Sequence, residues 1–349
     1  MNRSELERQI KQGEPVRKQS LVGLDLTGAA LAGGIFEHVD LRGAILAGAD
    51  LSECILDQCD LSGARLPAAR LDHSIWSKCA LREMVADSAS AVRSSFLECA
   101  IARATLTRAD LRHTDFASSP LSEVDLRGAD LTKSSFAVCG EVCADFTGAT
   151  LRETSFVGAD LRRAVLKQLT AHKTVFFQCQ LGPADLSGQR LPHVQFLECD
   201  LEGARFESCE LPTSGFRASN LRGADLSRAM APSCLFAEAS LERALAREAC
   251  LTQSVFAKAA LREANFAGSK LDQSAWLDAE ASAACFVGAD LTYADFSGAR
   301  LAAADFSHAT LFRTKFHRVD DAGAVFTSRA AALGDDPELL EAERWRPSI

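Results

Sequence analysis

The chain repeats a large apolar side chain at every fifth position. The repeat starts at Leu21 and keeps its phase without a slip to Phe326. Neither an α-helix, with a period of about 3.6 residues, nor an alternating strand, with a period of about 2, has this spacing. All but eight of these anchor positions hold Leu, Phe, Ile or Trp; the exceptions are Ala86, Ala91, Glu141, Ala171, Ala231, Ala246, Ala281 and Asp321. The sequence therefore predicts a solenoid of short repeats and not two or three conventional domains.

A second period of 20 residues is superimposed on the first. Every fourth anchor is aromatic: Trp76, Phe96, Phe116, Phe136, Phe156, Phe176, Phe196, Phe216, Phe236, Phe256, Trp276, Phe296 and Phe316. A period of four anchors predicts a coil with four sides. One of these sides is then built on stacked aromatic rings.

The residues around each anchor also recur. Ala49-Asp50-Leu51-Ser52 shows the full pattern, with a small residue two positions before the anchor and Asp directly before it. This pattern resembles the motif of the pentapeptide-repeat family, and the resemblance covers roughly nine tenths of the chain. It implies an all-β fold, a right-handed quadrilateral parallel β-helix. In that fold the anchor and the small residue point inward and the other three residues point outward.

A single pentapeptide cannot bury its anchor alone, so the coils must stack like parallel strands, about 4.8 Å apart. We expect about 15 coils over residues 19–328, which at that spacing make a rod roughly 70 Å long. Burial of each anchor contributes roughly 1.5 to 3 kcal/mol, which opposes the entropy lost on ordering the chain.

Short helices are expected to cap both ends. At the N-terminus, residues 1–18, Ser4 and Glu7 have the spacing of a capping box for a helix that ends near Gly13 and Pro15. The helix would cover the unpaired edge of the first coil.

At the C-terminus, residues 329–349, Asp336 and Pro337 are suited to the N-cap and first position of a helix through about Arg346. Leu339, Leu340 and Trp345 are available for burial. A role of this end in dimerisation is the alternative, so the protein is expected to be a monomer or a dimer.

Composition limits the classes of partner. A hydrophobic content of 47% with 24% charged residues excludes a disordered chain. The net charge of -9 argues against general binding to nucleic acid or to anionic membranes. No run of about 18 apolar residues occurs, and no apolar stretch follows the opening residues as in a signal peptide, so we expect a cytoplasmic protein.

The sequence shows no catalytic, cofactor or metal motif. Nine of the 12 cysteines occupy the inward small-residue position, where they read as core fillers in a reducing compartment. Cys139 and Cys143 lack the second ligand pair of a zinc site. We therefore expect neither enzymatic activity, nor a cofactor, nor a bound metal.

Glu141 stands where a buried anchor is expected, and an unpaired buried carboxylate is costly. Either the backbone bulges outward there or the carboxyl group is neutral or paired. We favour a bulge, because Gly140 permits it. Asp321 is interpreted in the same way, as part of a frayed final coil.

Two outward columns are candidate binding surfaces. The first, which we call the apolar stripe, comprises Leu97, Ala117, Ala137, Val157, Phe177 and Leu197, flanked by Val138 and Val175. A contiguous apolar patch on a folded protein is typical of a protein-binding surface. The alternative is that the corners of the coil, or a terminus, shelter these side chains.

The second, weaker candidate is the basic column, made of His73, Arg93, His113, Lys133, Lys173 and His193 and interrupted by Glu153. An anionic partner could lie along it. Asp110 and Asp130 dilute its field, so a solvated face is the simpler interpretation.

Two functions follow from these features. The first is a scaffold or adaptor that binds a protein; the stretch Glu14-Pro15-Val16 leading to Leu24-Asp25-Leu26-Thr27 resembles the start of bacterial pentapeptide proteins that accompany type VI secretion loci. The alternative is a mimic of DNA, because quinolone-resistance proteins that resemble this chain are acidic rods that bind DNA gyrase. A 70 Å length of DNA would carry roughly 40 negative charges, far more than the net charge of -9 of this chain, which argues against mimicry. Direct binding to nucleic acid is not expected.

Overall fold

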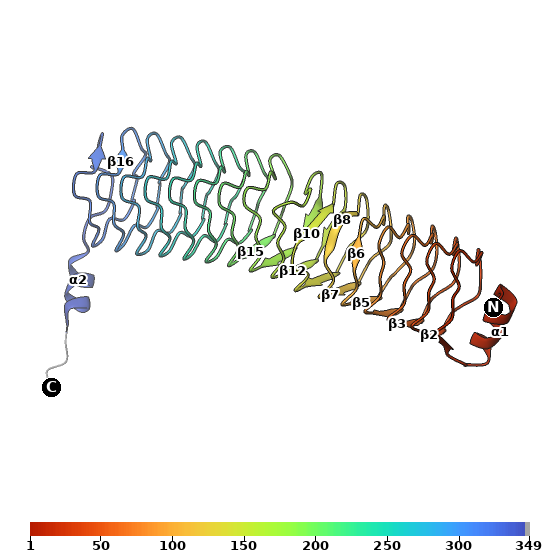
Figure 1. The fold of residues 1–349 in the computed structure, drawn as a ribbon. Helices are drawn as coiled ribbons and strands as arrows, with labels where there is room; N and C mark the ends of the chain where they lie inside the picture. Colours follow the sequence, from red (N-terminus) through yellow and green to blue (C-terminus); the bar gives the residue numbers. More distant parts are fainter. Residues whose placement is uncertain (346–349) are drawn as a thin grey trace. The chain divides into compact units, whose positions relative to one another are not determined.

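The computed structural model describes residues 1–345. They form two compact units: unit 1 is Met1–Leu181, and unit 2 begins at Gly182. In each unit the chain winds in four-sided coils (Figure 1). Most of the parallel bridges pair a residue with the one 20 positions further on. The predicted four-sided parallel β-helix is thereby confirmed in both units. The boundary after Leu181 lies inside segment 19–328, where the repeat keeps its phase.

Unit 1 contains helix α1 (Arg3–Lys11) and most of the regular strands. The strands of its largest sheet lie in the order β1 (Val16–Arg17), β2 (Ile35–Glu37), β3 (Ile55–Asp57), β4 (Ile75–Ser77), β5 (Ser95–Leu97), β7 (Asp115–Ala117), β9 (Ser135–Ala137), β12 (Ser155–Val157) and β14 (Val175–Phe177). The other sides carry β6 (Ile101–Ala102), β8 (Leu121–Asp125), β10 (Val142–Asp145), β11 (Thr150–Arg152) and β13 (Thr170–His172). All of these pairs are parallel, and all except β8 with β10 keep one register along the strand, as stacked coils require.

Each side of a coil ends in a tight turn. The amide of Leu24 donates to the carbonyl of Leu21 at 3.1 Å, and Gly23, two residues after the anchor, has φ +65°. A positive φ at this position is the signature of a type II turn, and glycine adopts it without strain. Many corners nevertheless hold other residues, such as His38 with φ +54°.

The interior consists of the anchors and the small residues, as predicted. In unit 1 the rings of Phe116 and Phe136 stack with centroids 4.9 Å apart. In unit 2 the rings of Phe216, Phe236 and Phe256 stack at the same spacing, with planes within 2° of parallel. Such columns join one coil to the next through offset-stacked rings.

Helix α1 covers the first coil of unit 1. Leu6 and Ile10 are buried, and Arg3 donates from its guanidinium to the carbonyl oxygens of Thr27 and Gly28 at 2.7 and 2.9 Å. The helix therefore satisfies carbonyl groups at the exposed end of the stack.

The predicted capping box of this helix was wrong in its residues. The Asn2 side chain accepts from the Glu5 amide, and the Glu5 carboxylate accepts from the Asn2 amide, both at 3.0 Å. Ser4 lies inside the helix. Glu7 is not free to cap, because it binds Arg3 at 2.9 Å and accepts from the amide of Ala30 at 3.1 Å.

The bulge at Glu141 is confirmed. Val142 takes the buried position and pairs with Leu121, and the register of the ladder shifts between Cys143 and Ala144. Glu141 points to solvent, and its carboxylate lies 3.0 Å from the guanidinium of Arg163. The extra residue thus moves the carboxyl group out of the core without breaking the next coils.

Unit 2 contains β15 (Gln195–Leu197), the parallel pair β16 (Asp305–Phe306) and β17 (Val325–Phe326), and helix α2 (Pro337–Arg344). Its remaining coils are joined by isolated parallel bridges. At the last coil the guanidinium of Arg329 lies over the Phe316 ring, 4.5 Å from its centroid, and pairs with Asp321. The final coil therefore ends on an arginine that covers the aromatic column.

Helix α2 begins as predicted, since the Asp336 side chain accepts from the amide of Leu339 at 3.1 Å. The expected end of the helix near Arg346 lies outside the described residues. The expected burial differs from the structure: Leu339 is 46% exposed and Trp345 is 73% exposed. The helix is held instead by polar contacts, among them an ion pair of 2.8 Å from Arg318 to Glu343.

Candidate functional site

The apolar stripe lies on the outer side of the largest sheet of unit 1. Phe177 pairs with Val157 between neighbouring strands β14 and β12, and Val175 lies at the other end of β14. These three side chains are half-buried, whereas Leu97 on β5 is 41% exposed. Ala117 and Ala137 lie between, on β7 and β9. The structure therefore brings the unit 1 members of the stripe together on one sheet surface.

Leu197, the remaining member of the stripe, belongs to unit 2. It lies at the end of β15 and is half-buried, with its side chain on the outer side of the coil.

Val138 is the most exposed large apolar side chain beside the stripe. It is 70% exposed and has φ +54°, a conformation that is strained for a β-branched residue. Its amide donates to the carbonyl of Val157 at 3.0 Å, and the next corner in the same column is Gly158. A Cβ atom at Gly158 would meet nothing within 4 Å, so the surface beside Val138 is open. The sequence places Val138 two residues after an anchor, which is the corner position with positive φ. Its strained backbone could have been predicted from that position.

Sequence reasoning missed an isoleucine ladder on the same sheet. Ile35, Ile55 and Ile75 pair in succession on β2, β3 and β4 and are 36%, 41% and 47% exposed. The 20-residue period, applied to the residue before each aromatic-side anchor, would have found them. They form a second apolar column near the first coil of unit 1, separate from the stripe, whose own column holds Glu37, Asp57 and Ser77 in these coils.

The basic column stands at corners with positive φ, and its members are exposed. Lys133 is paired with Glu153 at 3.8 Å. In the neighbouring column Arg112 hydrogen-bonds Asp110 and holds the pKa of that carboxyl below its usual range. His193, in unit 2, contacts Thr213 through Nδ1. The positive charge is therefore interrupted and partly neutralised, which favours a solvated face.

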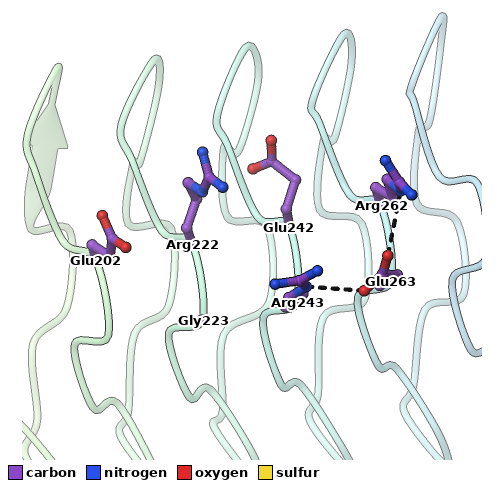
Figure 2. Close-up of a pocket in the computed structure, with 7 residues that line it drawn as sticks. All are labelled: Glu202, Arg222, Gly223, Glu242, Arg243, Arg262 and Glu263. Carbon is purple, nitrogen blue, oxygen red and sulfur yellow. Dashed lines mark hydrogen bonds and ion pairs between the residues drawn. The ribbon is translucent and has the colours of Figure 1, made fainter.

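A charged hollow of about 340 Å³ lies on unit 2, on a different side of the coil from Leu197 (Figure 2). Arg243 and Glu263 form an ion pair of 2.9 Å, which holds the pKa of Glu263 below its usual range. The lining residues are Glu202, Arg222, Gly223, Glu242, Arg243, Arg262 and Glu263. Acidic and basic side chains are equal in number here, so the hollow does not select a partner by charge.

The cysteines fill the interior as predicted. The nine at the inward position are buried, and none of the 12 forms a disulfide within residues 1–345. The Cys54 thiol donates to the Leu31 carbonyl at 3.0 Å, and burial raises the pKa of Cys54 to about 12. Such a thiol carries almost no thiolate at neutral pH and is a poor nucleophile.

Neither a metal cluster nor a membrane span is found in residues 1–345. No three or more His, Cys, Asp or Glu side chains in this range are placed to hold a metal ion. Both helices in the same range are too short to cross a bilayer.

The chain matches the family model described as pentapeptide repeats in 8 copies, over residues 20–63, 99–136, 142–168, 239–275 and 284–320. These ranges cover just over half of the sequence. The protein therefore belongs to the pentapeptide-repeat family, as the sequence pattern indicated.

Comparison with solved structures gives matches over most of this chain. HetL, a pentapeptide repeat protein involved in heterocyst differentiation regulation in the cyanobacterium Nostoc sp. strain PCC 7120, is 22% identical over 81% of this chain and 96% of its own, with a TM-score of 0.27. Full-length QnrB1, a plasmid-mediated fluoroquinolone resistance protein, is 18% identical over 70% of this chain and 97% of its own, with a TM-score of 0.27. Comparison with curated proteins gives no match.

Proposed function

We propose that this protein is a non-enzymatic scaffold that binds a protein partner through the unit 1 part of the apolar stripe. The observation that carries the proposal is Val138, a strained valine that is 70% exposed beside Val157. A β-branched residue in the left-handed region lowers stability, and strain of this kind concentrates at functional sites. The exposure of this apolar side chain is explained if a partner protein covers it.

Phe177 is the proposed anchor of the interface. It is the largest side chain of the stripe, it is half-buried, and it pairs with Val157 on the neighbouring strand. A rigid aromatic side chain gives much contact area with little loss of conformational entropy, and aromatic residues dominate interface energetics. The stripe lies on the outer side of a sheet, and such a surface fits a folded partner better than it fits a small molecule.

We further propose that the partner is a protein of a type VI secretion locus. The support is the resemblance of the stretch from Glu14 to Thr27 to the start of pentapeptide proteins that accompany such loci. The genes on either side of the coding sequence test this assignment directly.

Mimicry of DNA has less support. Arginines on the exposed faces bind the aspartates beside them: Arg127 pairs with Asp125, and Arg162 pairs with Asp160, both at 2.6 Å. These pairs lower the negative field that a DNA mimic needs, in addition to the modest net charge of -9.

The test compares two adjacent phenylalanines. Phe177→Glu should abolish capture of the partner from cells of the source organism, with the circular dichroism spectrum and Tm of the parent. Phe176→Glu should unfold neighbouring coils, because Phe176 is 4% exposed and stacks on Phe156 with ring centroids 5.1 Å apart. If Phe177→Glu destabilises the protein as severely as Phe176→Glu, Phe177 packs against its own chain and the proposal fails.

A further inference from the structure

Unit 2 contains a groove between helix α2 and the outer side of its last coils. Its volume is about 980 Å³, at the upper end of the range for ligand sites. Three leucines line it, and all are solvent-accessible: Leu277 on the coil is 44% exposed, Leu333 is 41% exposed, and Leu339 on α2 is 46% exposed. The groove thus has apolar walls from two separate elements.

The apolar surface continues from the groove onto the preceding coils. Leu235 pairs with Val255, and Val255 pairs with Ala275, in one outward column of successive coils. Leu235 is 49% exposed, and Val255 and Ala275 are half-buried. This column carries no charge until Asp295, which lies at the edge of the groove.

The charges around the groove are mostly acidic. Lys315 is the one lysine or arginine in the lining and is already paired with Asp295 at 3.4 Å. The acidic lining residues are Asp295, Asp335, Asp336, Glu338 and Glu343. A cationic group beside an apolar one would therefore find complementary charge here.

His317 supplies a second, independent observation. It lines the groove but is only 5% exposed, and its Nδ1 accepts from the Asp336 amide at 3.2 Å. The proton of the neutral ring is then on Nε2, which is buried and has no hydrogen-bond acceptor within residues 1–345. The Glu343 carboxylate oxygen lies 3.5 Å away, too far for a good hydrogen bond. A carbonyl oxygen of a bound peptide would satisfy this donor.

We propose that this groove binds a basic amphipathic peptide segment of a partner protein. An aliphatic side chain of the segment would lie between Leu277 and Leu339, its Lys or Arg side chains would face the acidic rim, and a backbone carbonyl would accept from His317. The site is separate from the apolar stripe of unit 1 and does not depend on the proposed function of that stripe.

The test uses full-length protein and three fluorescein-labelled peptides of equal length. One has Leu and Lys at helical spacing, the second replaces each Leu with Ser, and the third replaces each Lys with Glu. Fluorescence anisotropy at about 0.15 M salt should show saturable binding of the Leu–Lys peptide and at least about tenfold weaker binding of the other two.

Leu277→Ser and Leu339→Ser should each weaken binding of the Leu–Lys peptide by about tenfold, since each removes a half-exposed apolar contact. Glu338→Lys should weaken it through the rim charge. Met230→Ser is the matched control, because Met230 is 53% exposed in the same unit but does not line the groove. All variants are compared by Tm, and Phe177→Glu should leave peptide binding unchanged.

Three results would overturn the proposal. The first is an absence of saturable binding by the Leu–Lys peptide. The second is equal binding of the Ser–Lys peptide, which would mean attraction by charge alone. The third is unchanged peptide affinity in both leucine variants; if these variants also dissociate a dimer in sedimentation, the occupant of the groove is a second copy of the chain.

Discussion

Phe236 allows a quantitative test of the aromatic column. The side chain is 1% exposed, and its ring stacks on Phe216 and on Phe256 with centroids 4.9 Å apart on both sides. Phe236→Ala removes two stacking contacts, each worth about 0.5 to 1.5 kcal/mol, and leaves a cavity in the coil. Truncation of a buried phenylalanine costs about 3 to 5 kcal/mol in total, and we expect a loss in that range.

Phe312→Ala is the matched control. Phe312 is 50% exposed in the same unit and makes one edge contact, with Tyr293 at 5.7 Å. Its loss should cost at most about 1 to 1.5 kcal/mol, since half of the side chain is already in water.

Urea unfolding measures both variants. The chain has 3 tryptophans, so a Trp76→Phe, Trp345→Phe background leaves Trp276 as the only one. Trp276 stacks on Phe256 at 4.0 Å and therefore reports the coils of unit 2. The midpoint should fall much further for Phe236→Ala than for Phe312→Ala, at similar m-values. Equal midpoints would mean that the column contributes no more than an exposed ring, and the account of the core would be refuted.

Three further predictions concern thiols, acid and a corner residue. In the native protein a thiol reagent should react first with the three half-buried cysteines, Cys143, Cys250 and Cys285, and with the other nine only after unfolding. Counting the reactive thiols with and without denaturant checks this. Hydrogen bonds from arginines lower the pKa of several aspartates. The stability that these ionised carboxylates contribute is therefore present above about pH 4 and is lost as the pH falls through the lowered pKa values. Thermal melts between about pH 5 and 2 should show this loss. These carboxyl groups are Asp40, Asp110, Asp125 and Asp160. Val138→Gly should stabilise unit 1 by about 1 kcal/mol, because glycine adopts the φ of +54° without strain, and an unchanged or lower Tm would contradict this.

The interior could be predicted from sequence almost residue by residue. One residue in five is an anchor, and this spacing fixes which side chains point inward. Glu141 was recognised as an exception because a carboxylate cannot replace a buried apolar anchor. The structure places Val142 there instead. The charge on one residue was therefore enough to reveal a bulge.

Features outside the repeat were harder to predict. Asn2 and Ser4 are both good N-caps, and the choice between them depends on Glu7, which binds Ala30 some 23 positions away in sequence. The groove beside α2 depends on how the segment around Gly334 turns, and no periodicity specifies that path. The exposure of outward columns likewise depends on neighbouring coils, so the stripe could be located by period but its accessibility could not.

The left-handed corners have a consequence for how such a protein can evolve. A corner side chain contributes nothing to the interior, and a residue other than glycine costs roughly 1 to 2 kcal/mol there. Corners such as His38, Lys78 and Glu98 keep their side chains despite this cost, while Gly43 avoids it. Mutations at these positions can therefore change the outer surface one coil at a time without altering the core. We expect homologues to diverge fastest at the corners, and a new binding surface to arise there by single substitutions while the interior stays the same.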